Sequence, residues 1–134
     1  MKLDECKRIH RDMWNYIAGA EERTIYIGFA DNRSSIRTEL KYDFCARSNM
    51  TLKNSCALCE YALDYANQKD DESTHFSVSP DVCQYCPAVW GTENDLYGYY
   101  CECGKLKPDE RRLDWRYSKA SDIRDIKWKD EEER

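Results

Sequence analysis

Two Cys-x-x-Cys pairs constrain this chain more than any other feature of its sequence. The first pair is Cys56 and Cys59, and the second is Cys83 and Cys86. Two residues between thiols allow a tight turn to aim both sulfur atoms at one ion, and two such turns complete a tetrahedron. The spacing therefore predicts a four-thiolate zinc site. Such a site leaves no open position for water, so the zinc would be structural rather than catalytic.

The other cysteines leave the number of metal sites open. Cys101 and Cys103 lie one residue apart and are candidates for a second site, which Cys6, Cys45, His10 or His75 could complete. Alternatively, Cys101 or Cys103 replaces a member of the first set. We expect Cys6 and Cys45 to be core residues, because both fall on apolar helical faces and free cysteine is commonly buried. An iron–sulfur cluster is the alternative to zinc, because four cysteines also hold that cofactor.

The amino-acid composition indicates that the predicted metal site contributes to folding. Leu, Ile, Val and Phe make up roughly 16% of the chain, below the roughly 20% at which a chain struggles to bury enough apolar surface. The ten Tyr and four Trp residues supply part of the missing core. We expect the zinc site to supply the rest.

Hydrophobic periodicity predicts a mostly helical chain with a small β component. The expected helices cover Leu3–Ile17, Ser34–Cys45, the residues after Cys59, and Pro108–Ile123. A short strand is expected at Thr24–Ala30 and a hairpin within Trp90–Cys103. The predicted fold class is thus α+β, mostly α: a small single domain over residues 1–128, stapled by zinc and containing a short β-hairpin or sheet. Residues 129–134 are expected to form a frayed acidic tail.

Several classes of protein are excluded by composition and motif. No apolar run is long enough to span a membrane, and the charged N-terminal residues do not fit a signal peptide, so we expect a cytoplasmic protein. The chain has two histidines and none of the common catalytic motifs, which predicts that it is not an enzyme. An enzyme with an open zinc site using His75 is the least favoured interpretation.

Four segments carry a resemblance to a known group of proteins. They are His10–Ala18, Cys56–Ala62, Cys83–Trp90 and Ala120–Trp128. Together they resemble small cysteine-rich, zinc-binding accessory proteins of bacteriophages and bacterial mobile elements, which usually carry one further cysteine. The resemblance implies an accessory protein that acts in the cytoplasm of an infected bacterial host. It brings no established activity.

The favoured functional hypothesis is a non-enzymatic protein that binds a host or phage macromolecule, such as a component of host defence or transcription, and inhibits it. An acidic run and a tyrosine cluster are the candidate contact residues: Asp70, Asp71, Glu72, Tyr97, Tyr99 and Tyr100. The acidic run resembles nucleic-acid phosphates in charge. The plainer interpretation is that charge runs are solvated and that tyrosines cover a small core.

The alternative hypothesis is zinc-dependent binding of nucleic acid by residues 105–124. This segment holds seven Lys and Arg residues against four Asp and Glu, with aromatic side chains among them. The candidate residues are Arg111, Arg112, Trp115 and Arg116. Positive charge beside aromatic rings suits single-stranded nucleic acid. The sequence pI of about 5.1 is far from the basic charge of a dedicated binder, so this hypothesis ranks second.

Overall fold

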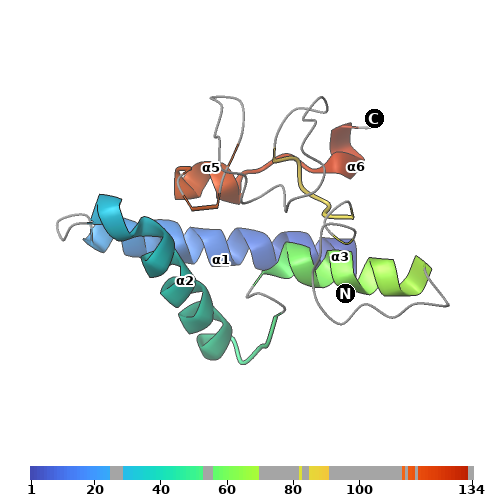
Figure 1. Ribbon diagram of the computed structural model, residues 1–134, viewed down its shortest axis with the longest axis horizontal. Helices are drawn as coiled ribbons and strands as arrows, with labels where there is room; N and C mark the ends of the chain where they lie inside the picture. Colours follow the sequence, from blue (N-terminus) through green and yellow to red (C-terminus); the bar gives the residue numbers. More distant parts are fainter. Residues whose placement is uncertain are drawn as a thin grey trace.

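The computed structural model describes residues 1–24, 29–52, 56–69, 82, 85–90, 113, 115–116 and 118–132. Within these residues the chain is mostly helical (Figure 1). The helices are α1 (Leu3–Thr24), α2 (Phe29–Arg47), α3 (Ala57–Lys69), α5 (Ala120–Arg124) and α6 (Lys129–Glu132). The long helices therefore come from the first half of the chain, and the last part of the chain returns to pack on them.

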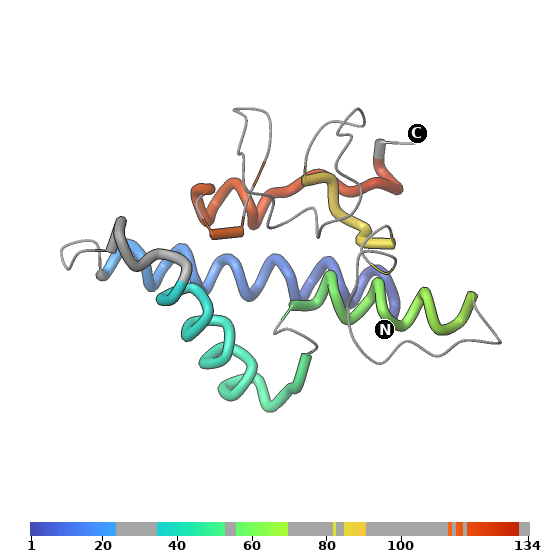
Figure 2. The backbone as a smooth tube through the Cα atoms, viewed as in Figure 1, coloured from blue at the N-terminus to red at the C-terminus, as the bar shows by residue number. Residues whose placement is uncertain are grey.

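Helix α1 is the centre of the fold, and α2, α3 and α5 all pack against it. Figure 2 shows the C-terminal segment on one side of α1, with α2 and α3 toward the other. Helix α3 runs antiparallel to α1 beside its N-terminal half, and its far end projects beyond α1 (Figure 1). The first turn of α3 is therefore held against the body of the protein, whereas its last turns extend away from it.

The apolar spacing predicts the buried face of α1 correctly but places the C-terminal end of the helix too early in the sequence. Cys6, Ile9, Met13, Trp14 and Ile17 are all buried, as expected for one stripe of a helix. The helix continues past Gly19 to Thr24. An added Cβ at Gly19 would meet no atom within 4 Å, so this glycine is simply a tolerated helical residue. The extra turn carries Glu21, which pairs with α2.

Helix α2 turns an unexpected face toward the core. The apolar row Ile36, Leu40 and Phe44 is only partly buried, and the neighbouring row formed by Arg37, Lys41 and Cys45 is buried instead. The helix ends in a Schellman motif: the Met50 N–H donates to the Cys45 carbonyl (2.9 Å) and the Asn49 N–H to the Ala46 carbonyl (3.2 Å). Asn49 has a φ of 53°, the left-handed conformation that this motif requires.

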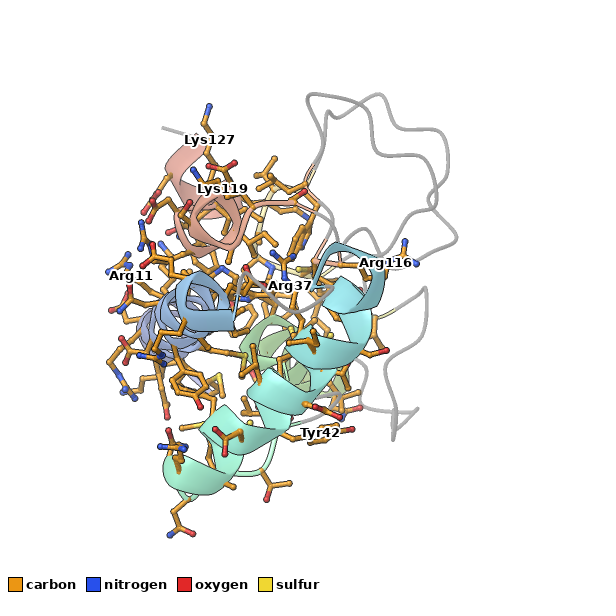
Figure 3. The ribbon with its side chains drawn as sticks, turned by 90° about the vertical axis from the view of Figure 1, so that its left-hand side faces the viewer. Arg11, Arg37, Tyr42, Arg116, Lys119 and Lys127 are labelled. Carbon is orange, nitrogen blue, oxygen red and sulfur yellow. The ribbon has the colours of Figure 1, made fainter. Side chains whose placement is uncertain are left out.

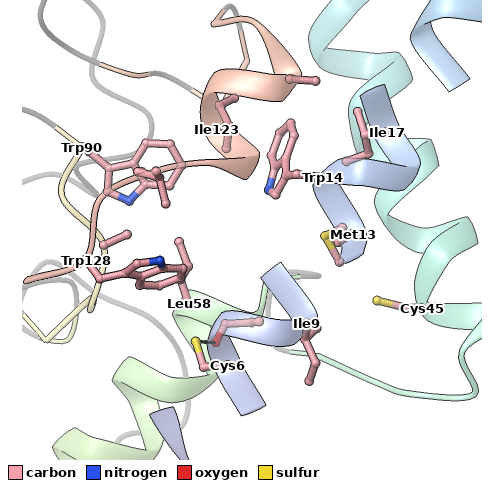
Figure 4. Packing of buried hydrophobic residues seen from close by; sticks show 14 residues of the cluster. Cys6, Ile9, Met13, Trp14, Ile17, Cys45, Leu58, Trp90, Ile123 and Trp128 are labelled. Atoms are coloured by element: carbon pink, nitrogen blue, oxygen red, sulfur yellow. Dashed lines mark hydrogen bonds between the residues drawn. The ribbon is translucent and has the colours of Figure 1, made fainter. Parts of the chain in front are cut away.

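The central core is a cluster built on α1 and closed by tryptophan side chains (Figure 4). Its buried members are Cys6, Ile9, Met13, Trp14, Ile17, Cys45, Ala57, Leu58, Ala88, Trp90, Ala120, Ile123, Ile126 and Trp128. Three of the four tryptophans of the chain are among them. Large rings and small alanines replace the missing Leu and Val, since each ring buries on the order of 150–250 Å². These side chains give the described residues an apolar interior, and the expected contribution of zinc to folding stays a prediction.

A short backbone clamp attaches the segment around Ala88 to the C-terminal segment. Ala88 and Trp128 form an isolated antiparallel bridge. The Val89 N–H donates to the Lys127 carbonyl (2.9 Å), and the Lys129 N–H donates to the Pro87 carbonyl (2.9 Å). This clamp brings Trp90 and Trp128 into the same core as α1.

The predicted α+β fold with a zinc-stapled hairpin or sheet is wrong. The part of the chain that the structure describes contains no sheet, only the isolated bridge between Ala88 and Trp128. The expected strand at Thr24–Ala30 fails where it is described, because Thr24 ends α1 and Phe29 begins α2. Residues 25–28 lie outside the described residues. Most of the expected hairpin at Trp90–Cys103 lies outside the described residues.

The C-terminal helix is shorter than its apolar spacing predicts. Trp115 and Arg116 form a turn, and α5 begins at Ala120; residues 108–112 of the expected helix lie outside the described residues. Beyond it, α6 occupies the start of the segment expected to fray. Lys7 of α1 donates to Asp130 (3.0 Å) and to Glu131 (3.3 Å), which ties α6 to the body.

No helix among the described residues has the length and apolar character needed to cross a membrane.

Candidate thiol site

Cys56 is the residue immediately before α3, and its position gives its sulfur atom an unusual environment. Its carbonyl accepts a hydrogen bond from the Glu60 N–H (3.0 Å), which begins the helix. Its sulfur accepts hydrogen bonds from the Cys59 thiol and from the backbone N–H groups of Cys59 and Leu58. These bonds, with the Cys59 thiol as the largest cause, hold the pKa of Cys56 well below its ordinary value. Cys56 is therefore disposed to be a thiolate.

Cys86 approaches this sulfur from the segment that leads into the backbone clamp. Its own sulfur accepts hydrogen bonds from the Ala88 N–H and from the Trp90 side chain. Burial nevertheless raises the pKa of Cys86 to about 12, and the nearby Cys56 thiol adds to that rise. In the absence of a bound cation Cys86 keeps its proton. A cation held by both sulfur atoms would displace it.

Cys6 adds a third segment to the same place. Its side chain is fully buried, and its thiol donates to the Ala57 carbonyl at 3.4 Å (Figure 4). Burial raises the pKa of Cys6, and the thiols of Cys56 and Cys86 raise it further. Helix α1, the start of α3 and the segment before Ala88 thus each bring a cysteine to one region. We call Cys6, Cys56, Cys59 and Cys86 the thiol group.

Lys41 of α2 places a positive charge near the thiol group. The residue is buried, and its Nζ lies over the ring of Trp115 at 4.1 Å and over that of Trp14 at 5.6 Å. Its charge contributes to lowering the pKa of Cys56. A buried ammonium is costly without a compensating anion, and a thiolate is such an anion. The sequence analysis did not predict Lys41 as a site residue, although Arg37, Lys41 and Cys45 at helical spacing form a polar row on α2.

The thiol group has the donor chemistry of a soft-metal site, but its described members do not by themselves form one. Among the residues that the structure describes, no three His, Cys, Asp or Glu side chains are placed to hold a metal ion. Of the predicted zinc ligands, Cys56, Cys59 and Cys86 are described, and Cys83 is not. The other candidates Cys101, Cys103 and His75 also lie outside the described residues.

Most predicted contact residues lie outside the described part of the chain. These are Asp70, Asp71, Glu72, Tyr97, Tyr99, Tyr100, Arg111 and Arg112. Two residues of the nucleic-acid hypothesis are described. Trp115 is partly buried against the central core, and the Nζ of Lys41 lies over one face of its ring, so that face is occupied within the chain. Figure 3 shows Arg116 on the opposite side of the molecule from Arg11, Lys119 and Lys127, which disperses the positive charge.

His10, on the apolar stripe of α1, is a core residue and not a ligand. Its Nε2 lies 2.7 Å from the Ile123 carbonyl, an acceptor, so this nitrogen carries the hydrogen. Burial lowers the pKa of His10 to about 4, and the ring remains neutral at pH 7. Its edge packs on Trp128, with ring centroids 5.4 Å apart.

A row of tyrosines beside the thiol group was also not predicted from the sequence. Tyr61 and Tyr65 of α3 stack with centroids 6.1 Å apart, and Tyr65 lies 5.2 Å from Tyr85. The Nζ of Lys69 sits over the rings of Tyr65 (5.4 Å) and Tyr85 (5.7 Å). The four-residue interval from Tyr61 to Tyr65 to Lys69 was the signal available in the sequence. We call Tyr61, Tyr65 and Tyr85 the tyrosine row.

Comparison of the chain with known protein families, with curated proteins and with solved structures finds no match.

Proposed function

We propose that this chain is a zinc-binding accessory protein without enzymatic activity, which acts by binding a host or phage macromolecule. The observation that supports zinc is the environment of Cys56. Its sulfur accepts hydrogen bonds from the Cys59 thiol and from two backbone N–H groups, and Cys86 lies close enough that, besides burial, the Cys56 sulfur raises the pKa of Cys86. Thiolates prepared in this way are the usual ligands of structural zinc.

The proposed ligands are Cys56, Cys59, Cys83 and Cys86. Backbone N–H donors to the first and last of these sulfur atoms would hold them in place and offset their negative charge. Lys41 would offset more of that charge from the α2 side. Bound zinc would hold the start of α3 against the segment before Ala88. The central core beside it is built from apolar side chains.

A role in binding is supported by how the described polar groups are used. The ring nitrogen of His10 is occupied by the Ile123 carbonyl, and the guanidinium of Arg37 by Glu21 and the Trp115 carbonyl. These groups maintain the fold and are shielded from any substrate. The sulfur ligands would be saturated by zinc. The proposed role is therefore that of a scaffold that presents a surface.

Metal analysis of the purified chain tests the proposal. We expect one zinc per chain, and Cys59→Ser should lose it while retaining most of its helical circular dichroism. Cys45→Ala is the matched control, because it removes a buried thiol on α2 that is not a proposed ligand. It should retain the metal. Wild-type protein without zinc, or zinc retained by Cys59→Ser, would contradict the ligand assignment.

A further inference from the structure

The tyrosine row and Lys69 form an aromatic surface that the central core does not use. Tyr65 is 37% exposed, which makes it one of two large exposed apolar side chains among the described residues. Beneath the row lies a small cluster of Ala62, Leu63, Ala66 and Val82, against which Tyr85 packs. The rings thus have a fixed base and a partly open outer side.

The row is attached to both Cys-x-x-Cys pairs. Tyr61 follows Cys59 by two residues on α3, and Tyr85 lies inside the second pair, directly before Cys86. The far end of α3 projects beyond α1 (Figure 1), and Tyr65 and Lys69 in the second half of this helix are both exposed. The start of the row is therefore anchored at the thiol group, and its other end is available for contact.

Lys69 reveals what this surface attracts. Its ammonium lies over two ring faces at once, 5.4 Å from the centroid of Tyr65 and 5.7 Å from that of Tyr85. The face of an aromatic ring carries negative potential and draws cations. Lys69 is exposed, so an incoming cation can displace it without disturbing buried structure.

The charge of the surrounding sequence points to the same type of partner. Residues 48–100 contain two Lys and Arg residues against eight Asp and Glu, and Lys69 is one of the two. Glu60 and Asp64 lie on α3, with Asp64 already paired to the amino group of Met1 (3.0 Å). Asp70, Asp71 and Glu72 follow Lys69 directly in the sequence. This acidic setting repels phosphate and favours a basic partner.

We propose that the tyrosine row is a docking surface for an arginine- or lysine-bearing segment of a partner protein, whose cation takes the place of Lys69 over Tyr65 and Tyr85. This proposal rests on the proposed binding function and specifies the chemical character of the partner, a positively charged side chain. Arginine suits the surface best, because its planar guanidinium stacks on aromatic rings as well as carrying charge. Tyrosines anchored in this way are frequent centres of binding energy in protein interfaces.

A fluorescence-anisotropy titration of the full chain with a labelled arginine–serine repeat peptide tests the proposal. The wild-type chain should bind this peptide and should bind neither a glutamate–serine repeat nor oligothymidylate. Tyr65→Ala should weaken binding about 5-fold or more, whereas Tyr65→Phe keeps the ring face and should stay close to wild type. Unchanged affinity in Tyr65→Ala would overturn the proposal, as would preferential binding of oligothymidylate.

The variant Lys69→Met tests whether the ring faces or the net charge of the protein controls peptide binding. Removing the internal cation should tighten peptide binding about 3-fold, since the peptide no longer competes with it. Lys127→Met makes the same change in net charge at an exposed site on the C-terminal segment (Figure 3) and should have little effect. Equal tightening in both variants would show that only net charge matters and would contradict the docking surface.

The zinc content of every variant is measured in parallel, so the two proposals fail separately. Peptide binding lost in Tyr65→Ala with zinc retained supports the docking surface. A wild-type chain that holds no zinc yet binds the arginine peptide would contradict the zinc assignment alone. Zinc retained with no peptide binding by the wild-type chain would contradict the docking surface alone.

Discussion

The central core and the cluster beneath the tyrosine row differ in what they bury. The central core has three tryptophans, Met13 and several isoleucines around α1. The cluster beneath the row, here called the satellite cluster, consists of Ala62, Leu63, Ala66 and Val82, with Tyr85 packed against it. Burial free energy follows apolar area, about 25 cal/mol per Å². The central core therefore supplies most of the stability, and the satellite cluster supports a surface.

The two regions also treat polar groups differently. In the central core His10 is bound by the Ile123 carbonyl and Arg37 by Glu21, and the buried Lys41 is enclosed by the rings of Trp14 and Trp115. Beside the satellite cluster, Lys69 rests only on ring faces among its described contacts, and Tyr65 is partly open. Groups that are satisfied internally serve the fold, and groups that are left accessible can serve a partner.

The largest expected effect tests the central core. Trp14 is 3% exposed, so Trp14→Ala should lower the free energy of unfolding by about 3–5 kcal/mol, measured by urea denaturation. Tyr42→Ala is the control, because Tyr42 is 62% exposed and points away from α1 (Figure 3). It should stay within about 0.5 kcal/mol of wild type. A small effect at Trp14 would remove the distinction between the two regions.

The buried ion pair between α1 and α2 comes next. The Arg37 Nε lies 2.6 Å from Glu21 Oε1, and its Nη1 donates to the Trp115 carbonyl (2.8 Å). Arg37→Met should cost about 3 kcal/mol of unfolding free energy, because it leaves a largely buried carboxylate unpaired. Adding Glu21→Gln should recover much of that loss. If the double variant were no more stable than Arg37→Met, the unpaired charge would not be the cause.

Acid should weaken the central core through His10. Burial lowers the pKa of His10 in the folded chain to about 4, against an ordinary value of 6.5. The unfolded chain binds a proton as pH falls through 6.5, while the folded chain does not until about 4, so stability is full above 6.5 and is lost toward 4. The loss should be about 2–3 kcal/mol. Urea denaturation across this range should show a flatter profile for His10→Gln than for wild type, and parallel profiles would exclude His10 as the cause.

The smallest expected effect concerns the satellite cluster. Val82 is fully buried, and Val82→Ala should lower the free energy of unfolding by about 1–2 kcal/mol. Near-ultraviolet circular dichroism from the tryptophans of the central core should remain as in wild type at low temperature. A changed tryptophan signal would show that the two clusters are one packing unit.

The long helices could be predicted from sequence, but their ends and faces could not. The stripe from Cys6 to Ile17 identifies α1 because one face meets most of its packing partners. The strand expected at Thr24–Ala30 is wrong where the segment is described. Local propensity takes no account of the tertiary ion pair between Glu21, on the continuation of α1, and Arg37 of α2. On α2 the buried cations could not be predicted, since their burial depends on tryptophans at distant positions in the chain.

The candidate site was predicted in part by spacing. The pair Cys56 and Cys59 stands out because ligand spacing is local, and the start of α3 follows from the same residues. That Cys6 approaches them could not be foreseen, because α1 and α3 meet only through tertiary packing. The zinc assignment itself stays a prediction. The tyrosine row could not be predicted in full, because Tyr85 joins it only through a tertiary contact with Tyr65, which lies in a different segment of the chain.

One hydrogen bond has a practical consequence for engineering this molecule. The Leu113 N–H donates to the Trp90 carbonyl at 2.8 Å, so two positions far apart in the sequence lie side by side. Leu113 also packs against the central core to which Trp90 belongs. A label attached at Leu113 would therefore sit beside Trp90 and report on the packing of the core at that point.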